Sequence, residues 1–234
     1  MILLGCRMDH VLHSGVVPMQ PTRRSSRQIV HSVAAVVFLV ADDYLLVEAP
    51  GDDSAGTDHG QAHLYRNSTG ELLQTLSIPG FSGGFGFGNV VAVDGENVLI
   101  GQRTRGDSDV RLFDARTGLL VHRFTDPTPT GFDLFGEAVA IDENNVLVGA
   151  RGDNTRGLRV GQAHLFDVAS GHLVHTFDDP TPNVDRNSND RFGSSVAIEG
   201  NIVGVGPPGD RTTRLWWHAH RFDAITGDLR RTYE

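Results

Sequence analysis

Histidine is the residue type in this chain best suited to acid–base or metal chemistry, and the sequence contains 11 histidines. His63, His164 and His220 occupy the same place in three segments of similar sequence, and His122 and His175 share a second place. Equivalent places in a repeated structure belong to different copies and lie far apart unless they line a common axis. We therefore interpret these histidines as ordinary strand residues rather than as ligands of one metal ion.

The acidic residues offer one further metal candidate, the run Asp185–Asp190. This run alternates oxygen-bearing side chains as calcium loops do, but Asp190 stands where such a loop needs glycine for its sharp turn. A solvated loop is the preferred interpretation, with calcium as the alternative. Because Cys6 is the single cysteine, an intrachain disulfide and a cysteine-built zinc site are both excluded. We predict no metal, no cofactor and no catalytic residues.

Two short motifs are candidates for binding a partner. The adjacent pair Trp216 and Trp217 is the best candidate contact patch, and burial of the same pair in the interior is the alternative. The tripeptide Arg-Gly-Asp occurs at 105–107 and 151–153, but Gly-Asp also recurs at 51–52 and 209–210. We interpret Gly-Asp as a turn that ends a strand, so an adhesion role for the tripeptide is not predicted.

Apart from Cys6, these residues lie in a part of the chain where one segment of sequence is repeated four times. The copies begin at residues 34, 87, 135 and 192, and the last three open with Phe-Gly. Their spacing of about 50 residues is typical of propellers, solenoids and other repeat arrays. The 28 glycines and 10 prolines fit a chain with many tight turns.

Each copy is predicted to form four short strands. Apolar residues on successive positions, as in Val146–Val148, indicate strands that are covered on both faces. Asp114–Gly118, Asp167–Gly171 and Asp223–Gly227 are predicted to be hairpin turns that an aspartate side chain caps and a glycine closes. The predicted fold is all-β, a propeller-type array of four-stranded antiparallel blades. The blades are expected over residues 33–80, 81–130, 131–184 and 185–234, after an unassigned lead-in of residues 1–32.

The copies resemble FG-GAP repeats, the blades of the integrin α-subunit propeller. The resemblance rests on Phe-Gly-x-x-Val-Ala-Ile/Val at 87–93, 135–141 and 192–198, and on variants of Gly-Ala-Pro such as 149–153. It covers residues 33–234 and implies a propeller in which Phe87, Phe135 and Phe192 fill the gaps between blades. Integrin-type calcium loops lie between the first two strands, where the present links are too short to carry the ligands. The resemblance also implies a secreted or cell-envelope protein.

A second resemblance supplies the enzyme alternative. Leu-Phe-Asp-x-x-Thr-Gly, as at 112–118, resembles the repeat of pyrroloquinoline quinone dehydrogenase propellers. Those repeats end in a tryptophan that docks neighbouring blades. The matching residues here are instead Leu76, Phe124, Phe177 and Tyr233. A quinoprotein-like redox role is therefore the alternative to a non-catalytic protein.

Charge and chain segments limit the partners. A formal net charge of −9 disfavours nucleic acid. Arg23–Arg27 followed by Val33–Ala41 resembles a signal peptide, but the second segment also aligns with the repeat, so Val33–Val40 is predicted to be a strand and no membrane span is predicted.

The lead hypothesis is a binding, adhesion or structural scaffold. Its contacts with a protein or glycan are expected on the divergent loops 51–60, 152–161 and 209–218. Four blades leave two end faces, expected to be apolar, and we predict association into a homo-dimer through them. Closure of the four blades into one small ring is the alternative.

Overall fold

The computed structural model describes residues 38–41, 43–49, 60–77, 87–102, 108–182, 190–206 and 218–233. These residues form sixteen strands in four sheets, and they contain no helix long and apolar enough to cross a membrane. The strands are β1 (Phe38–Ala41), β2 (Tyr44–Ala49), β3 (Gln61–Arg66), β4 (Leu72–Leu76), β5 (Phe87–Asp94), β6 (Asn97–Gln102), β7 (Asp109–Asp114), β8 (Leu120–Thr125), β9 (Phe135–Asp142), β10 (Asn145–Ala150), β11 (Gln162–Asp167), β12 (Leu173–Asp178), β13 (Ser195–Glu199), β14 (Ile202–Gly206), β15 (Ala219–Asp223) and β16 (Leu229–Tyr233).

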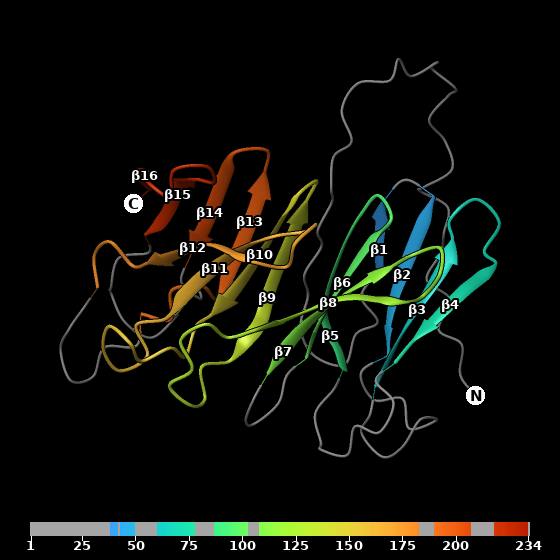
Figure 1. The fold of residues 1–234 in the computed structure, drawn as a ribbon, viewed down its shortest axis with the longest axis horizontal. Helices are drawn as coiled ribbons and strands as arrows, with labels where there is room; N and C mark the ends of the chain where they lie inside the picture. The colour runs from blue at the N-terminus through green and yellow to red at the C-terminus, as the bar shows by residue number, and fades with distance from the viewer. Residues whose placement is uncertain are drawn as a thin grey trace, which may run out of the picture.

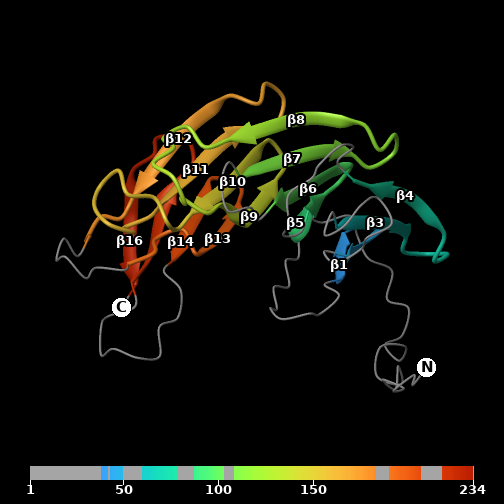
Figure 2. The ribbon, with the colours of Figure 1, turned by 90° about the horizontal axis from the view of Figure 1, so that it is seen from below.

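Each sheet is a meander of four consecutive antiparallel strands, which we call the first to fourth blades. The opening strands contact one another, β1 with β5, β5 with β9, and β9 with β13. The blades form an open arc with the first and fourth at opposite ends (Figures 1 and 2). The predicted all-β array of propeller blades is confirmed. Strand β1 begins at Phe38; residues 33–37 and the lead-in to residue 32 lie outside the described part of the chain.

The core consists of three clusters, each shared by two adjacent blades. Phe135 opens the third blade and lies in the cluster between the second and third blades, where it is 2% exposed. Phe192 plays the same part between the third and fourth blades and is 1% exposed. Both phenylalanines therefore fill the gap between neighbouring blades, as the repeat predicts. The Phe87 side chain is outside the described part.

Glycine is required where the backbones of two blades meet. A Cβ on Gly149 of β10 would lie 1.9 Å from the carbonyl oxygen of Gly193, at the opening of the fourth blade. Gly101 of β6 has the same relation to Gly136, with a distance of 2.4 Å. Gly136 and Gly193 also have φ values of 86° and 88°, a region that L-residues rarely adopt. The repeated glycines thus permit both the local turn and the close approach of blades.

The third hairpin turns of the second, third and fourth blades are capped by an aspartate as the sequence predicts. The carboxylate of Asp114 accepts hydrogen bonds from the backbone N–H of Arg116 and Thr117 at 3.0 and 2.8 Å, and Gly118 has a φ of 69°. Asp223 caps the turn of the fourth blade in the same way. The repeated aspartates are therefore turn residues.

The same turns receive a hydrogen bond from the preceding blade. Gln74 Nε2 lies 3.0 Å from the carbonyl oxygen of Arg116, and His122 Nε2 lies 3.1 Å from that of Ala169. His175 Nε2 makes the third such contact, 3.0 Å from the carbonyl oxygen of Ile225. The fourth strand of one blade thus bonds to the third turn of the next. We call these contacts the outer links.

A second set of links joins the first turns. Asp94 accepts a hydrogen bond at 2.7 Å from the backbone N–H of Glu143 in the next blade, and Asp142 accepts one from Gly200. Glu143 has a φ of 48°, whereas Gly95 and Gly200 occupy this conformation in the neighbouring blades without a Cβ. We call these contacts the inner links.

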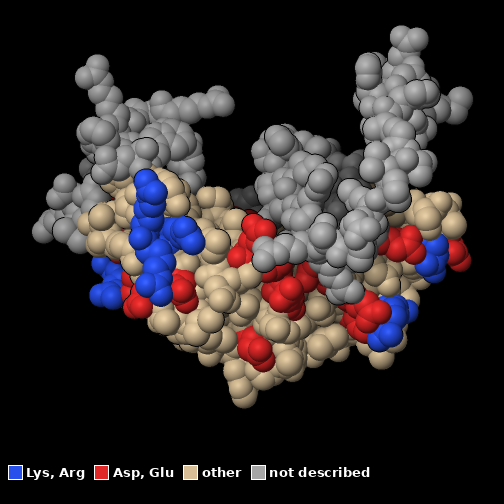
Figure 3. Space-filling view, turned by 90° about the horizontal axis from the view of Figure 1, so that it is seen from above, with Lys and Arg blue, Asp and Glu red and all other residues tan. Residues whose placement is uncertain are grey.

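The outward face of the fourth blade differs from the expectation of an apolar end. Leu147 and Leu165, both fully buried against the fourth blade, correspond in the fourth blade to Gly204 and Arg221. Burial along β13 alternates, so only one face of this strand is covered. The expected apolar end face is therefore wrong for the described residues of the fourth blade. Figure 3 shows basic side chains gathered at the end of the molecule where this blade lies.

The outward face of the first blade does carry apolar side chains. Leu45, Val47 and Tyr65 are half-buried, while Leu46 and Leu64 face the second blade and are fully buried. Dimer formation through the two end faces stays a prediction. Of the two end faces, the apolar side chains that would favour it are described on that of the first blade.

Candidate functional site

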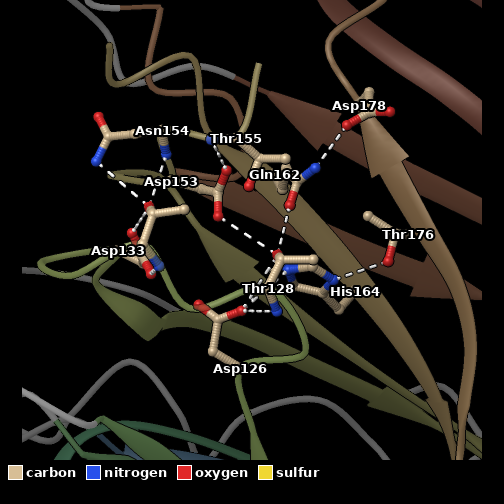
Figure 4. Close-up of polar contacts among 11 residues, drawn as sticks. Asp126, Thr128, Asp133, Asp153, Asn154, Thr155, Gln162, His164, Thr176 and Asp178 are labelled. Carbon is tan, nitrogen blue, oxygen red and sulfur yellow. Dashed lines mark hydrogen bonds and ion pairs between the residues drawn. The ribbon is translucent and has the colours of Figure 1, made fainter. Parts of the chain in front are cut away.

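Three acidic side chains converge at the junction of the second and third blades. Asp126 and Asp133 come from the link between β8 and β9, and Asp153 follows β10 (Figure 4). One carboxylate oxygen of each residue lies within 4.8 Å of one oxygen of each of the others. We call these three residues the junction triad.

Local turns aim the three carboxylates inward. Asp126 Oδ1 accepts the backbone N–H of Thr128 at 2.8 Å across Pro127, and Asp153 Oδ1 accepts that of Thr155 at 2.7 Å. Asp133 accepts hydrogen bonds from the backbone and hydroxyl of Thr130. Side-chain oxygens that bond to a backbone N–H two or three residues away are typical of such turns.

Backbone strain accompanies this arrangement. Phe132 and Leu134, which flank Asp133, both have a φ of 57°. Bulky residues in this region cost of order 1–3 kcal/mol each and persist where the surroundings impose the conformation. Gly152 supplies part of that constraint, because its backbone N–H donates to the carbonyl oxygen of Asp133 at 2.8 Å and a Cβ would lie 2.3 Å from the carbonyl oxygen of Phe132.

A chain of hydrogen bonds leads from the triad to the outer strand of the third blade. The Thr128 hydroxyl lies 2.9 Å from Gln162 Oε1 and 3.4 Å from Asp153 Oδ2. Gln162 Nε2 donates to Asp178 Oδ1 at 2.7 Å (Figure 4). Arg156 binds the other oxygen of Asp178 at 2.6 Å. The Thr128 hydroxyl has a single proton to donate. The shorter distance indicates that it donates this proton to Gln162 Oε1 rather than to the Asp153 carboxylate.

Burial weakens the acidity of two members of the triad, Asp126 and Asp153. Desolvation raises the pKa of Asp126 to about 6, and repulsion from Asp133 and Asp153 adds to the shift. Desolvation also raises the pKa of Asp153. Adjacent buried carboxylates disfavour ionisation in this way unless a cation compensates them.

His164 lies directly behind the triad. It is fully buried, its Nδ1 lies 3.1 Å from the Thr176 hydroxyl, and its Nε2 lies 3.9 Å from Asp126 Oδ1. Burial lowers the pKa of His164 to about 4, so the ring is neutral at pH 7. His220 repeats the arrangement, with its Nε2 3.7 Å from Asp179 Oδ1. The histidines of this strand position are thus separate from one another, as predicted, but two are buried beside a carboxylate.

A pocket of about 420 Å³ adjoins the triad. Its walls combine polar and apolar residues from the second blade, from the link to the third blade and from the first residue of β9. They are Ser108, Arg123, Thr125, Asp126, Pro129, Gly131, Phe132, Asp133, Leu134 and Phe135. The Phe132 side chain is 71% exposed. An exposed aromatic ring beside a pocket with a few polar groups is a common feature of binding sites.

The structure describes only some of the residues that the sequence analysis singled out. Trp216 and Trp217 lie outside the described residues, as do 185–189, 51–59 and 105–107. In the second Arg-Gly-Asp tripeptide, Asp153 is fully buried and Arg151 forms an ion pair with Glu137. The tripeptide at 151–153 is therefore a structural turn, as predicted.

Comparison with known families assigns the repeat that surrounds the site. Residues 121–166, which extend from β8 to β11, match the FG-GAP repeat. The chain contains an FG-GAP repeat. All three residues of the junction triad fall within the matched stretch, so the triad belongs to the FG-GAP repeat and its entry from the preceding blade.

Solved propeller structures share the fold. A europium-containing methanol dehydrogenase superposes with a TM-score of 0.55 at 12% identity, over 91% of this chain and 44% of that one. A quinohemoprotein alcohol dehydrogenase from Comamonas testosteroni gives 0.55 at 17% identity, over 86% and 35%. The present chain thus spans less than half the length of either enzyme, and the likeness is one of fold alone. No curated protein is significantly similar to it in sequence.

Proposed function

We propose that this FG-GAP protein is a non-catalytic binding scaffold, exported to the cell envelope or the medium, that holds a protein or glycan partner at the junction of the second and third blades. The supporting observation is Phe132, an aromatic side chain 71% exposed at the edge of the pocket. Its left-handed backbone is imposed by the packed link, so the ring is presented without a large entropic cost.

The rest of the frame supports the same function. Strands and turns repeat from blade to blade, whereas the loop 151–161 carries Arg156, Arg159 and the exposed Leu158. This loop contacts the link between the blades through the hydrogen bond from Gly152 to Asp133. Constant strands that carry divergent loops are the usual organisation of binding propellers. Sequencing the N-terminus of the native protein tests export.

Binding is tested with immobilised full-length chain, using a glycan array and the secreted proteins of the source organism as probes. Phe132→Ala should lose the retained partner, because truncation of an aromatic anchor commonly costs 2 kcal/mol or more of binding free energy. Ile225→Ala is the matched control, since Ile225 is 68% exposed on the fourth blade. Equal retention by both variants, or none by the wild type, would refute the proposal.

A quinoprotein-like redox role is the second candidate, favoured by the shared fold of the two dehydrogenases. Against it, the docking tryptophan of such repeats is replaced by Leu76, Phe124 and Phe177, which are buried between the blades. Pyrroloquinoline quinone added together with calcium distinguishes the two. A quinone absorbance band that remains with the protein, or a rise in Tm beyond that from calcium alone, would favour the redox role.

A further inference from the structure

The junction triad concentrates negative charge that the neighbouring cations do not neutralise. Three carboxyl groups converge, and Asp133 and Asp153 are 6% and 0% exposed. The nearby arginines form ion pairs with other acidic residues. These pairs are Arg123–Asp109, Arg151–Glu137 and Arg156–Asp178. Buried carboxylates are normally paired or bound to a metal ion.

Two buried atoms, one in the triad and one beside it, have no hydrogen-bond partner among the described residues. One is Oδ2 of Asp126, whose side chain is 9% exposed, and the other is Nε2 of the fully buried His164. His164 Nε2 points toward Asp126 Oδ1 from 3.9 Å, beyond hydrogen-bond range (Figure 4). An unpaired buried polar atom costs about 1–3 kcal/mol, so its presence calls for a ligand that would satisfy it.

The spacing of the carboxylates fits one ion. Oxygen atoms bound to a single Ca²⁺ lie 2.3–2.6 Å from it, so any two of them are at most roughly 5 Å apart. The three oxygens of the triad lie within 4.8 Å of one another. We propose that Asp126, Asp133 and Asp153 bind a Ca²⁺ ion at the junction of the second and third blades, with the Thr128 hydroxyl as a further oxygen nearby.

This site differs in place from the calcium loops of integrin-type blades. Those loops lie between the first two strands, where this chain has short turns such as 142–145. The junction triad combines the link between two blades with the turn after β10. A bound cation would therefore join two segments that come from different parts of the repeat, and it would hold the link 126–134 against the turn 150–153.

The test uses the full-length chain, freed of metal with a chelator and then titrated with CaCl₂ by calorimetry. We expect saturable binding of one ion, in the range of about 10⁻⁶ to 10⁻³ M that calcium sites of this kind span. Asp153→Asn should weaken binding at least tenfold. Glu199→Gln, an exposed acid on the fourth blade, should leave it unchanged.

The wild-type chain supplies a test that does not depend on the folding of any variant. Hydrogen exchange should slow on addition of CaCl₂ in peptides that cover 126–134 and 150–161. Slowing confined to other segments, the run at 185–190 included, would overturn the proposal, and so would wild-type affinity in Asp153→Asn. Absence of saturable binding up to about 10 mM CaCl₂, well above the weakest such sites, would also overturn it. Equal or tighter binding of MgCl₂ would overturn the choice of Ca²⁺.

Discussion

Substitution of Gly149 by alanine should separate the third and fourth blades. The new Cβ would lie 1.9 Å from the carbonyl oxygen of Gly193, whereas real Cβ contacts stay beyond 3.0 Å. Gly149 is backbone of the paired strand β10, and Gly193 is backbone of the turn before β13, so relief requires the blades to part by more than about 1 Å. A gap of this size removes a quarter to a half of the dispersion energy of each contact across the interface.

The expected cost lies at the upper end of the range for overpacked cores, about 3 kcal/mol in the free energy of unfolding. For a chain of this size that corresponds to a fall in Tm of roughly 6–12 °C. Thermal and urea unfolding followed by circular dichroism measure both quantities, and the urea slope shows whether unfolding stays cooperative.

Gly206→Ala is the matched control, since Gly206 occupies the same place in the fourth blade. Among the described residues, a Cβ there would meet only the Ser195 hydroxyl, at 2.7 Å, and that hydroxyl can rotate away. The lower entropy of the unfolded chain with alanine, about 0.4–1 kcal/mol, should keep this variant near the wild type. If Gly149→Ala and Gly206→Ala unfold within about 0.5 kcal/mol of each other, an error typical of such comparisons, the close approach does not hold the blades together.

Three further predictions concern single residues. Glu143→Gly should raise the free energy of unfolding by about 1 kcal/mol in urea titrations, because glycine adopts the φ of 48° without strain; a loss of stability would contradict this. His175→Ala should cost about 1 kcal/mol by removing an outer link, and an unchanged Tm would show that the link contributes nothing. Burial raises the pKa of Glu48 to about 7, so the folded chain keeps a proton between pH 4.5 and 7 that the unfolded chain has released, and stability should fall as the pH rises through this window. Glu48→Gln should flatten that fall, and its free energy of unfolding at pH 8 should exceed that of the wild type by at most about 3 kcal/mol. Parallel pH profiles of the two proteins would contradict this prediction.

Local patterns predicted the blades because each pattern describes a local geometry. Asp114 and Gly118 specify their hairpin through one carboxylate and one positive φ, and the apolar runs specify strands covered on both faces. Phe135 and Phe192 were predictable as inter-blade residues because a large apolar side chain at a constant place in every repeat needs a constant partner.

The candidate site was not predictable in the same way. Asp126 and Asp153 each satisfy a turn within two residues, and that role alone accounts for their place in the sequence. Their convergence depends on the path of the link across two blades, which no short motif records. The loss of apolar residues from the outward face of the fourth blade could have been predicted from the sequence. Gly204 and Arg221 stand where the third blade has Leu147 and Leu165.

The outer and inner links impose an order on the folding of the blades during synthesis at the ribosome. Each link joins a blade to a residue 42 to 58 positions further along the chain, from Gln74 and Arg116 to Asp142 and Gly200. At roughly 5–20 residues per second, a newly emerged blade waits several seconds for the partner that completes it. A nascent blade therefore always presents an unfinished side toward the ribosome, and the next blade folds against that template. The blades therefore fold one after another from the N-terminal to the C-terminal end of the array.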